Sequence, residues 1–83
     1  METRDYSFDI LAQRFREMAY LNRGMALVKL GDNNSAVADL TKSIALGANI
    51  ADAYESRSEA YSNLGKKDLA AKDKATAVKL SNK

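Results

Sequence analysis

The chain contains one module twice, offset by 34 positions, in residues 19–46 and 53–80. A constant period of 34 residues with small, aromatic and glycine residues at fixed places is typical of helix–turn–helix repeats, which bury their apolar faces by stacking. Some pairs keep only their size class, namely Gly24/Ser58, Leu27/Tyr61, Ser43/Ala77 and Ile44/Val78. The identical pairs are Ala19/Ala53, Tyr20/Tyr54, Arg23/Arg57, Ala26/Ala60, Leu30/Leu64, Gly31/Gly65, Ala36/Ala70, Asp39/Asp73 and Leu46/Leu80.

The turn residues predict helices near residues 7–30, 33–46, 51–64 and 67–80. Gly31 and Gly65 supply the left-handed conformation that commonly ends a helix, and Gly47 is placed to end the second one. Short loops of this kind join antiparallel neighbours. The residues that could cap the following helices are Asp32, Asn33, Asn34 and Asn49.

Small residues at repeated positions indicate where helices approach one another closely. We expect the two helices of each hairpin to cross at the pairs Gly24/Ser58, Ala26/Ala60 and Ala36/Ala70. The pairs Tyr20/Tyr54 and Leu27/Tyr61 are expected to fill the space between one hairpin and the next. A single hairpin would leave one apolar face open, so stability should come from stacking.

Both copies resemble the tetratricopeptide repeat. The first copy carries the resemblance in Ala19-Tyr20-Leu21-Asn22-Arg23-Gly24-Met25-Ala26, in Leu30-Gly31-Asp32 and in residues 38–44. The resemblance implies an all-α fold of two antiparallel helix–turn–helix repeats with an extended N-terminal helix. We divide the chain into an extension at 1–16 and repeats at 17–50 and 51–83. Ala48 and Lys74 depart from the family pattern, and Lys74 indicates an exposed last helix.

The N-terminal segment is similar to a different protein. Residues 6–24 resemble a helix of the DNA gyrase B subunit, in the place where the transducer domain follows the ATPase domain. This similarity overlaps the repeat pattern at residues 19–24, as a recombined or deliberately fused chain would show. No nucleotide-binding motif of gyrase accompanies it, so inherited DNA-related activity would depend on one helix without its catalytic context.

The composition argues against catalysis. Without histidine and cysteine, the chain lacks the commonest general base, a strong nucleophile and the usual zinc ligands. Asp52, Glu55 and Glu59 share one helical face, but solvated acidic faces are much commoner than acid–base pairs. We therefore expect no enzyme, no catalytic residue, no metal and no cofactor.

The composition of the chain also limits the classes of partner that we expect. The lysines of the last 18 residues are not interleaved with arginine or aromatic residues, which favours a solvated helix over a nucleic-acid site. No apolar run approaches the roughly 18 residues of a membrane span, and the charged N-terminus does not resemble a signal peptide. We expect a cytoplasmic chain whose partner is a protein or peptide.

One candidate binding surface follows from the family resemblance. The concave groove of such repeats is lined by the first helix of each copy. Only Asn22 matches the set that holds a terminal carboxylate in some members, and the acids opposite would repel one. A basic or apolar peptide suits the groove better. The implied residues are Leu21, Asn22, Met25, Val28, Lys29, Asp52, Glu55, Ser56, Glu59 and Ser62.

The other candidate surface lies on the long first helix. One apolar stripe of that helix contains Phe8, Leu11, Phe15, Ala19, Ala26 and Leu30, and a second face contains Ile10, Met18, Leu21, Met25 and Val28. A helix of roughly 24 residues would be about 36 Å long and would overhang its partner by two or three turns. The exposed overhang predicts self-association through Phe8, Leu11, Phe15 and Met18, either by folding back or, as we favour, in a symmetric homodimer.

These observations favour a non-enzymatic protein–protein interaction module that uses repeat stacking and self-association. The alternative is a designed or recombined chimera of a gyrase-type helix and a repeat hairpin, with no evolved function.

Overall fold

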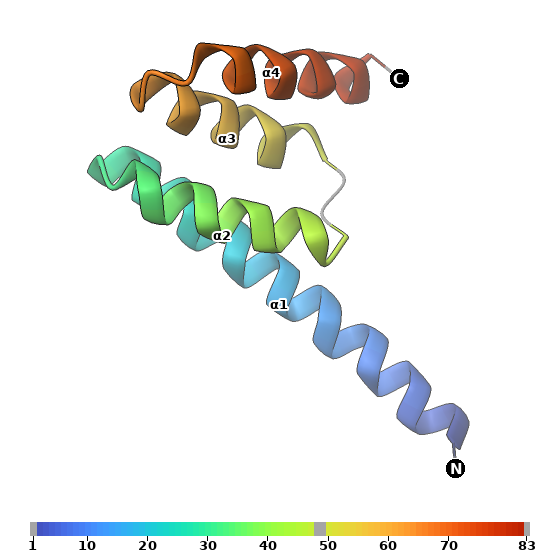
Figure 1. Cartoon of the computed structure of the whole chain (residues 1–83). Helices are drawn as coiled ribbons and strands as arrows, with labels where there is room; N and C mark the ends of the chain where they lie inside the picture. The colour runs from blue at the N-terminus through green and yellow to red at the C-terminus, as the bar shows by residue number, and fades with distance from the viewer. Residues whose placement is uncertain (1, 48–49, 83) are drawn as a thin grey trace.

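The computed structural model describes the backbone of residues 2–47 and 50–82 and the side chains of residues 11–47 and 50–82. In this part of the chain, the elements are α1 (Glu2–Leu30), α2 (Asn33–Ala45), α3 (Ala51–Asn63) and α4 (Lys67–Ser81). They form two hairpins, α1–α2 and α3–α4, that stack through α2 and α3 (Figure 1). The predicted all-α fold is confirmed. The first helix begins at residue 2 rather than 7, and the predicted cap Asn49 lies outside the described residues.

The two glycine turns have the geometry that the repeat predicts. Gly31 and Gly65 have φ values of 87° and 80°. After α1, the Asp32 amide donates to the Leu27 carbonyl at 2.9 Å and the Gly31 amide to the Val28 carbonyl at 3.1 Å. This pair of bonds is a Schellman motif, which satisfies the last carbonyls of a helix. After α3, the amides of residues 66 and 65 make the equivalent bonds, so both hairpins turn in the same way.

The helix starts differ from one another. Asp32 is the N-cap of α2, and its Oδ1 accepts a hydrogen bond from the Ser35 amide at 3.4 Å. Asn33 uses its side chain instead to donate to the Gly31 carbonyl at 3.3 Å. Ile50 precedes α3 in an extended conformation and makes no side-chain cap bond. Of the cap candidates that the structure describes, Asp32 is therefore the one that caps.

Close contact within the first hairpin depends on Gly24. A Cβ atom at Gly24 would lie 2.6 Å from Cγ of Leu40, which is fully buried. In the second hairpin Ser58 takes the glycine position, and its hydroxyl donates to the Ala70 carbonyl at 2.8 Å. Ala36 and Ala70 are buried as expected. The backbones of each hairpin thus approach too closely for larger side chains at these positions.

The prediction that Ala26 and Ala60 lie where the two helices of a hairpin cross was wrong. Ala60 is fully buried in the core, whereas Ala26 is exposed. The two alanines hold the same position in their repeats, but Ala60 is covered by the first hairpin and no earlier hairpin covers Ala26 in the described chain. This position therefore packs between repeats rather than within a hairpin.

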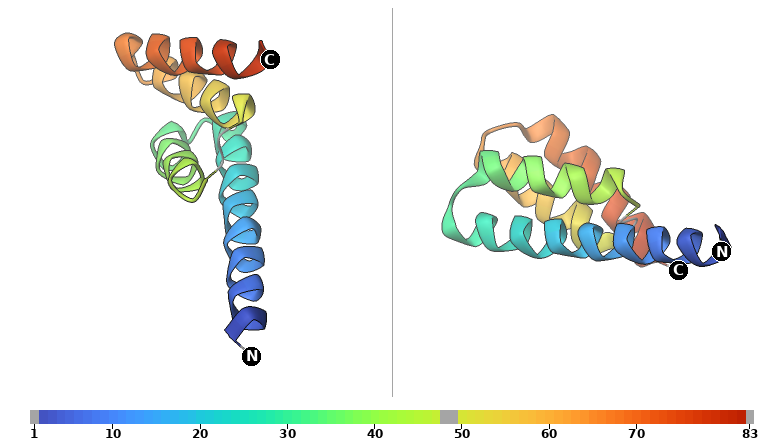
Figure 2. Two further views of the ribbon diagram at one scale, coloured as in Figure 1. Left: turned by 90° about the vertical axis from the view of Figure 1, so that its right-hand side faces the viewer. Right: turned by 90° about the horizontal axis from the view of Figure 1, so that it is seen from below.

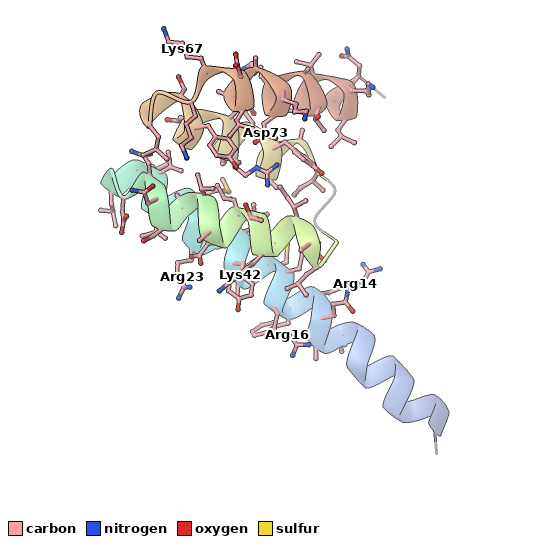
Figure 3. All side chains as sticks on the ribbon, viewed as in Figure 1. Arg14, Arg16, Arg23, Lys42, Lys67 and Asp73 are labelled. Carbon is pink, nitrogen blue, oxygen red and sulfur yellow. The ribbon has the colours of Figure 1, made fainter. Side chains whose placement is uncertain are left out.

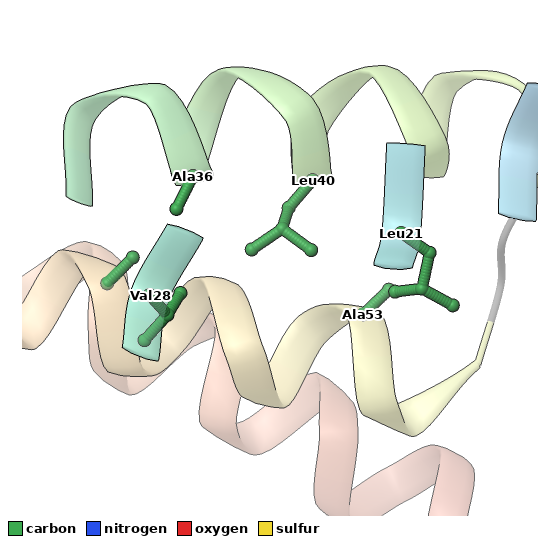
Figure 4. Close-up of a cluster of buried hydrophobic side chains, with 6 residues drawn as sticks. Leu21, Val28, Ala36, Leu40 and Ala53 are labelled. Atoms are coloured by element: carbon green, nitrogen blue, oxygen red, sulfur yellow. The ribbon is translucent and has the colours of Figure 1, made fainter. Parts of the chain in front are cut away.

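The core lies at the junction of the two repeats. Its buried apolar residues are Leu21, Val28, Ala36, Leu40, Ala53 and Ala60, and most of them are labelled in Figure 4. The second repeat contributes only alanine to this cluster. Small side chains on α3 let that helix lie close to the leucine and valine side chains of α1 and α2. Among the described residues, the junction between the repeats therefore holds the cluster of buried apolar side chains.

The first half of α1 extends beyond the rest of the molecule. Toward its N-terminus, α1 makes two polar contacts with α2 and the turn after it among the described side chains: the Ser43 hydroxyl donates to the Glu17 carbonyl and Gln13 Nε2 donates to the Leu46 carbonyl, both at 2.8 Å. Residues 2–12 continue as helix for about three further turns, or roughly 16 Å, away from the other helices (Figure 2). The predicted overhang is confirmed, and α1 is unbroken, so the segment does not fold back on its own repeats.

Candidate functional site

An ion pair occurs at the same place in both repeats. Arg23 donates from Nε and, at 2.9 Å, from Nη2 to the carboxylate of Asp39. Arg57 makes the matching bonds to Asp73 at 2.7 and 2.9 Å. Sequence reasoning missed these pairs, although the recurrence of arginine and aspartate 16 positions apart in both copies was the available signal. Each pair ties the two helices of one hairpin together with a bidentate, charge-assisted contact.

The two pairs have different surroundings. Arg57 also donates to Thr41 Oγ1 of the first repeat at 3.2 Å and lies 5.7 Å from the ring centres of Tyr54 and Tyr61. The Arg23 side chain is 66% exposed, against 17% for Arg57. Arg23 and Lys42, both labelled in Figure 3, lie 5.9 and 5.4 Å from the ring centre of Tyr20, and no hairpin of the described chain covers this ring. The first repeat therefore exposes a face that the second repeat buries.

Hydrogen bonding also shifts the acid–base equilibria of these groups. The bonds from Arg23 lower the pKa of Asp39, although burial of that carboxyl opposes the change. The bonds to Asp73 raise the pKa of Arg57. The first shift favours the charged form of Asp39, and the second favours the charged form of Arg57.

One edge of each repeat faces the repeat that follows it; we call this the trailing edge. In the first repeat it consists of Leu21, Val28 and Leu40, all buried beneath α3. The corresponding residues of the second repeat are Glu55, Ser62 and Lys74, all exposed, and Lys74 Nζ lies 3.6 Å from Glu55 Oε2. The trailing edge of the second repeat, which lies on α3 and α4, is therefore polar and exposed.

The opposite edge of the first repeat is apolar and open. Ala53 and Ala60 of α3 are fully buried, whereas their equivalents Ala19 and Ala26 on α1 are exposed. Exposed apolar residues continue this surface in both directions along α1. We call the whole surface the α1 stripe; its described members are Leu11, Phe15, Ala19, Ala26 and Leu30.

Large exposed apolar side chains lie close together near the start of the described part of α1. Phe15 is 77% exposed, Leu11 is 68% exposed and Met18 is 48% exposed. These three residues line one shallow, almost wholly apolar hollow of about 560 Å³, together with Ala12 and Arg14. Three of the four self-association candidates are therefore brought together; the side chain of Phe8 lies outside the described residues. An exposed group of large apolar residues is a common mark of an interaction surface.

A second surface is a groove between the repeats. It has a volume of about 540 Å³, and its walls come from α1, α3 and α4. The structure brings these groove candidates together in its lining: Met25, Val28, Lys29, Asp52, Glu55, Ser56, Glu59 and Ser62. It adds residues that sequence reasoning missed, namely Ser58, Asn63 and Lys74.

Two groove candidates lie elsewhere. Leu21 is 3% exposed and, unlike Val28, does not line the groove, so its assignment to the groove was wrong. Asn22 is exposed but does not line the groove. Adjacent positions of a helix point about 100° apart, so neighbouring residues of α1 face the core, the groove and solvent in turn. Among the described side chains, no group of three or more acidic residues could hold a metal ion. None of the described helices combines the length and apolar character that a membrane span needs.

Comparison with known proteins identifies the repeats and two partial relatives. The chain shares 49% identity over 37 residues with the novobiocin-sensitive DNA gyrase B subunit from Streptomyces niveus, and the same identity with the DNA gyrase B subunit from Streptomyces coelicolor. Each match covers 45% of this chain, and the chain spans about 5% of the length of these relatives. No solved structure matches the chain.

The family comparison covers most of the chain. The Tetratricopeptide repeat family matches twice, at residues 19–49 and 51–83. Each segment contains a glycine turn and an ion pair, and the first segment begins within α1. The chain belongs to the tetratricopeptide repeat family.

Proposed function

We propose that the chain is a non-enzymatic protein-interaction module that self-associates through the α1 stripe. The single observation that carries this proposal is the exposure of Phe15 and Leu11 on an unbroken helix that extends past its own hairpin. Transfer of a phenylalanine or leucine side chain from water into a contact is favourable by about 1.5–3 kcal/mol when burial is complete. A partner that covers this surface would gain that free energy without refolding the repeats.

Because the trailing edge of the second repeat is polar, we favour the α1 stripe of a second copy of the chain as the partner of the α1 stripe. Repeats stack when the small residues of one meet the large apolar residues of the one before, as Ala53 and Ala60 meet Leu21 and its neighbours. A head-to-tail stack of two chains would place the α1 stripe against Glu55, Ser62 and Lys74, which lack the apolar side chains that such a contact requires. A two-fold contact of stripe with stripe has apolar residues on both sides and closes as a dimer.

Charge substitution within the α1 stripe tests this proposal. Phe15→Glu and Leu11→Glu should each convert the dimer into a monomer, because a carboxylate would be buried without a partner. Leu69→Glu is the matched control, since Leu69 is an exposed apolar residue on α4 outside the stripe. Light scattering coupled to size-exclusion chromatography gives the mass of each variant. A dimer that persists in Phe15→Glu, or that is lost equally in Leu69→Glu, would contradict the assigned surface.

The gyrase-like segment favours a second candidate. A recombined or designed chimera of a gyrase-type helix and a repeat hairpin would fold without having an evolved partner. It would keep the exposed overhang as a remnant of contacts made in the parent protein. This hypothesis predicts a folded monomer at every concentration, so the same mass measurement distinguishes it from self-association.

A further inference from the structure

A hollow lies between the two helices of the first hairpin, beside the ion pair of Arg23 and Asp39. Figure 3 shows Arg23 on the side of this hairpin that faces away from α3 and α4. The hollow has a volume of about 350 Å³ and is open to solvent. Its lining consists of Arg23, Leu27, Ser35, Ala38 and Asp39. None of these residues belongs to the α1 stripe or lines the groove between the repeats, so the hollow is a separate site.

The second repeat shows which side chains surround the equivalent ion pair. Arg57, which pairs with Asp73, lies 5.7 Å from the ring centres of both Tyr54 and Tyr61. A guanidinium group within about 6 Å of a ring centre makes a favourable cation–π contact. In the second repeat, two tyrosine rings therefore accompany the paired arginine.

The first repeat keeps one of these two rings. Tyr20 holds the place of Tyr54, and its ring centre lies 5.9 Å from the guanidinium of Arg23. Leu27 holds the place of Tyr61 in the sequence, and this leucine lines the hollow. A leucine side chain is shorter than that of tyrosine and has no ring. The hollow therefore corresponds to the place of a tyrosine ring in the second repeat.

The lining of the hollow matches the chemistry of a phenol. Two hydrogen bonds to Asp39 hold the guanidinium of Arg23, and the Arg23 side chain is 66% exposed, so a ring can approach it. Leu27 and Ala38 add apolar surface. Ser35 adds a hydroxyl group, which can donate to or accept from a phenolic O–H. The hollow thus offers a cation, an apolar wall and a hydrogen-bonding group to one aromatic ring.

The open form of the hollow favours a protein side chain over a free small molecule as the occupant. Small-molecule sites usually bury most of the surface of their ligand. A side chain that a folded partner presents needs less enclosure, because the surface of the partner covers the rest of the ring.

We propose that the hollow is the anchor site for a tyrosine side chain of a protein partner. The ring stacks on the guanidinium of Arg23 and contacts Leu27, and its hydroxyl group bonds to Ser35. Aromatic anchors in small pockets are common centres of binding energy at protein interfaces. The lining residues lie outside the α1 stripe, so this site does not depend on self-association.

Nuclear magnetic resonance titration with capped amino acids tests the proposal. The probe is N-acetyl tyrosine amide, and its matched control is the capped derivative of cyclohexylalanine, which has a saturated ring. The tyrosine derivative should shift the amide resonances of residues 23, 27, 35, 38 and 39 in a saturable way. It should bind about two- to fivefold more tightly than the control, as expected for an exposed cation–π contact.

Matched variants locate the bound ring. Leu27→Tyr introduces the residue that the second repeat has, so it should fill the hollow and abolish the saturable shifts. Leu69→Tyr places the same ring at an exposed position on α4 and should leave binding unchanged. Arg23→Gln should weaken binding about two- to fivefold, whereas Arg16→Gln, at an exposed position on the same helix, should not.

Three results would overturn the proposal. The first is equal binding of the tyrosine and cyclohexylalanine derivatives. The second is the same saturable shifts in Leu27→Tyr as in the parent, or equal affinities in Arg23→Gln and Arg16→Gln. The third is a set of shifts confined to Leu11, Phe15 and Met18, which would place the ring in the apolar hollow of the overhang instead.

Discussion

Arg57 and Asp73 join the two helices of the second hairpin through two hydrogen bonds, and the arginine also bonds to Thr41 of the first repeat. One side chain thus couples the helices of a hairpin to each other and one repeat to the next. Arg23 makes the same contact with Asp39 but has no earlier repeat to bond to in the described chain. The hydrogen bond from Arg57 to Thr41 is therefore a contact that forms only where one repeat stacks on another.

Arg57→Met should therefore destabilise the chain more than Arg23→Met. Loss of Arg57 leaves the buried Asp73 carboxylate without its cation and removes the contact with Thr41. The expected decrease in the free energy of unfolding is about 2 kcal/mol for Arg57→Met, since hydrogen bonds to charged groups contribute about 1.5–3 kcal/mol. Urea denaturation followed by circular dichroism measures both variants. Equal losses would show that the contact between repeats adds nothing.

Gly24→Ala tests the close crossing of α1 and α2. Overpacking against Leu40 costs about 1–3 kcal/mol, and the better helix propensity of alanine returns about 1 kcal/mol. We expect a net decrease of about 1 kcal/mol in the free energy of unfolding. In a Leu40→Ala background the added methyl group has room, so the same change should become neutral or stabilising. Destabilisation of similar size in both backgrounds would mean that Leu40 is not the neighbour that matters.

The glycine turns give a test that does not involve packing. No atom lies within 4 Å of a Cβ added at Gly31 or Gly65, so only the positive φ values oppose substitution. Gly31→Ala and Gly65→Ala should each lower the free energy of unfolding by about 1 kcal/mol, and valine should cost more. Thermal unfolding of the four variants checks this. An unchanged melting temperature for Gly31→Val would contradict the turn assigned there.

Acid should remove the contribution of the Arg23–Asp39 pair. The pKa of Asp39 is lower in the folded chain than in the unfolded chain, where an aspartate has a pKa of about 3.9. Its contribution is therefore complete above about pH 4 and is lost as the pH falls through the lower folded value. The melting temperature of the parent should exceed that of Asp39→Asn at neutral pH, and the difference should narrow below pH 4. A constant difference down to pH 2 would exclude this linkage.

The recurring positions allowed the fold to be predicted, because glycine turns and apolar spacing are local properties of the chain. Gly31 and Gly65 set the helix ends, and the uninterrupted pattern of α1 predicted its overhang. Ala26 and Ala60 show the limit of this reasoning. Identical residues at identical repeat positions are exposed in one copy and buried in the other, because their burial depends on whether a neighbouring repeat covers them.

The lining of the groove could be predicted only in part, and the reason is related. Val28 and Leu21, two turns apart on α1, are both buried in the core, but only Val28 also lines the groove. Sequence spacing places both on α1 but does not fix how far α3 covers each one. The role of Lys74 beside Glu55 depends on two helices meeting across a hairpin, a contact that neither helix pattern contains.

Sedimentation equilibrium of the unmodified chain tests the central claim most directly. The chain contains no cysteine, so its mass reports non-covalent association alone. At concentrations from tens to hundreds of micromolar, self-association through the α1 stripe predicts a mass approaching twice the 9.1 kDa of one chain, with no larger species. A mass of 9.1 kDa throughout this range would contradict the account, and so would a mass that keeps rising with concentration, as a head-to-tail stack would produce.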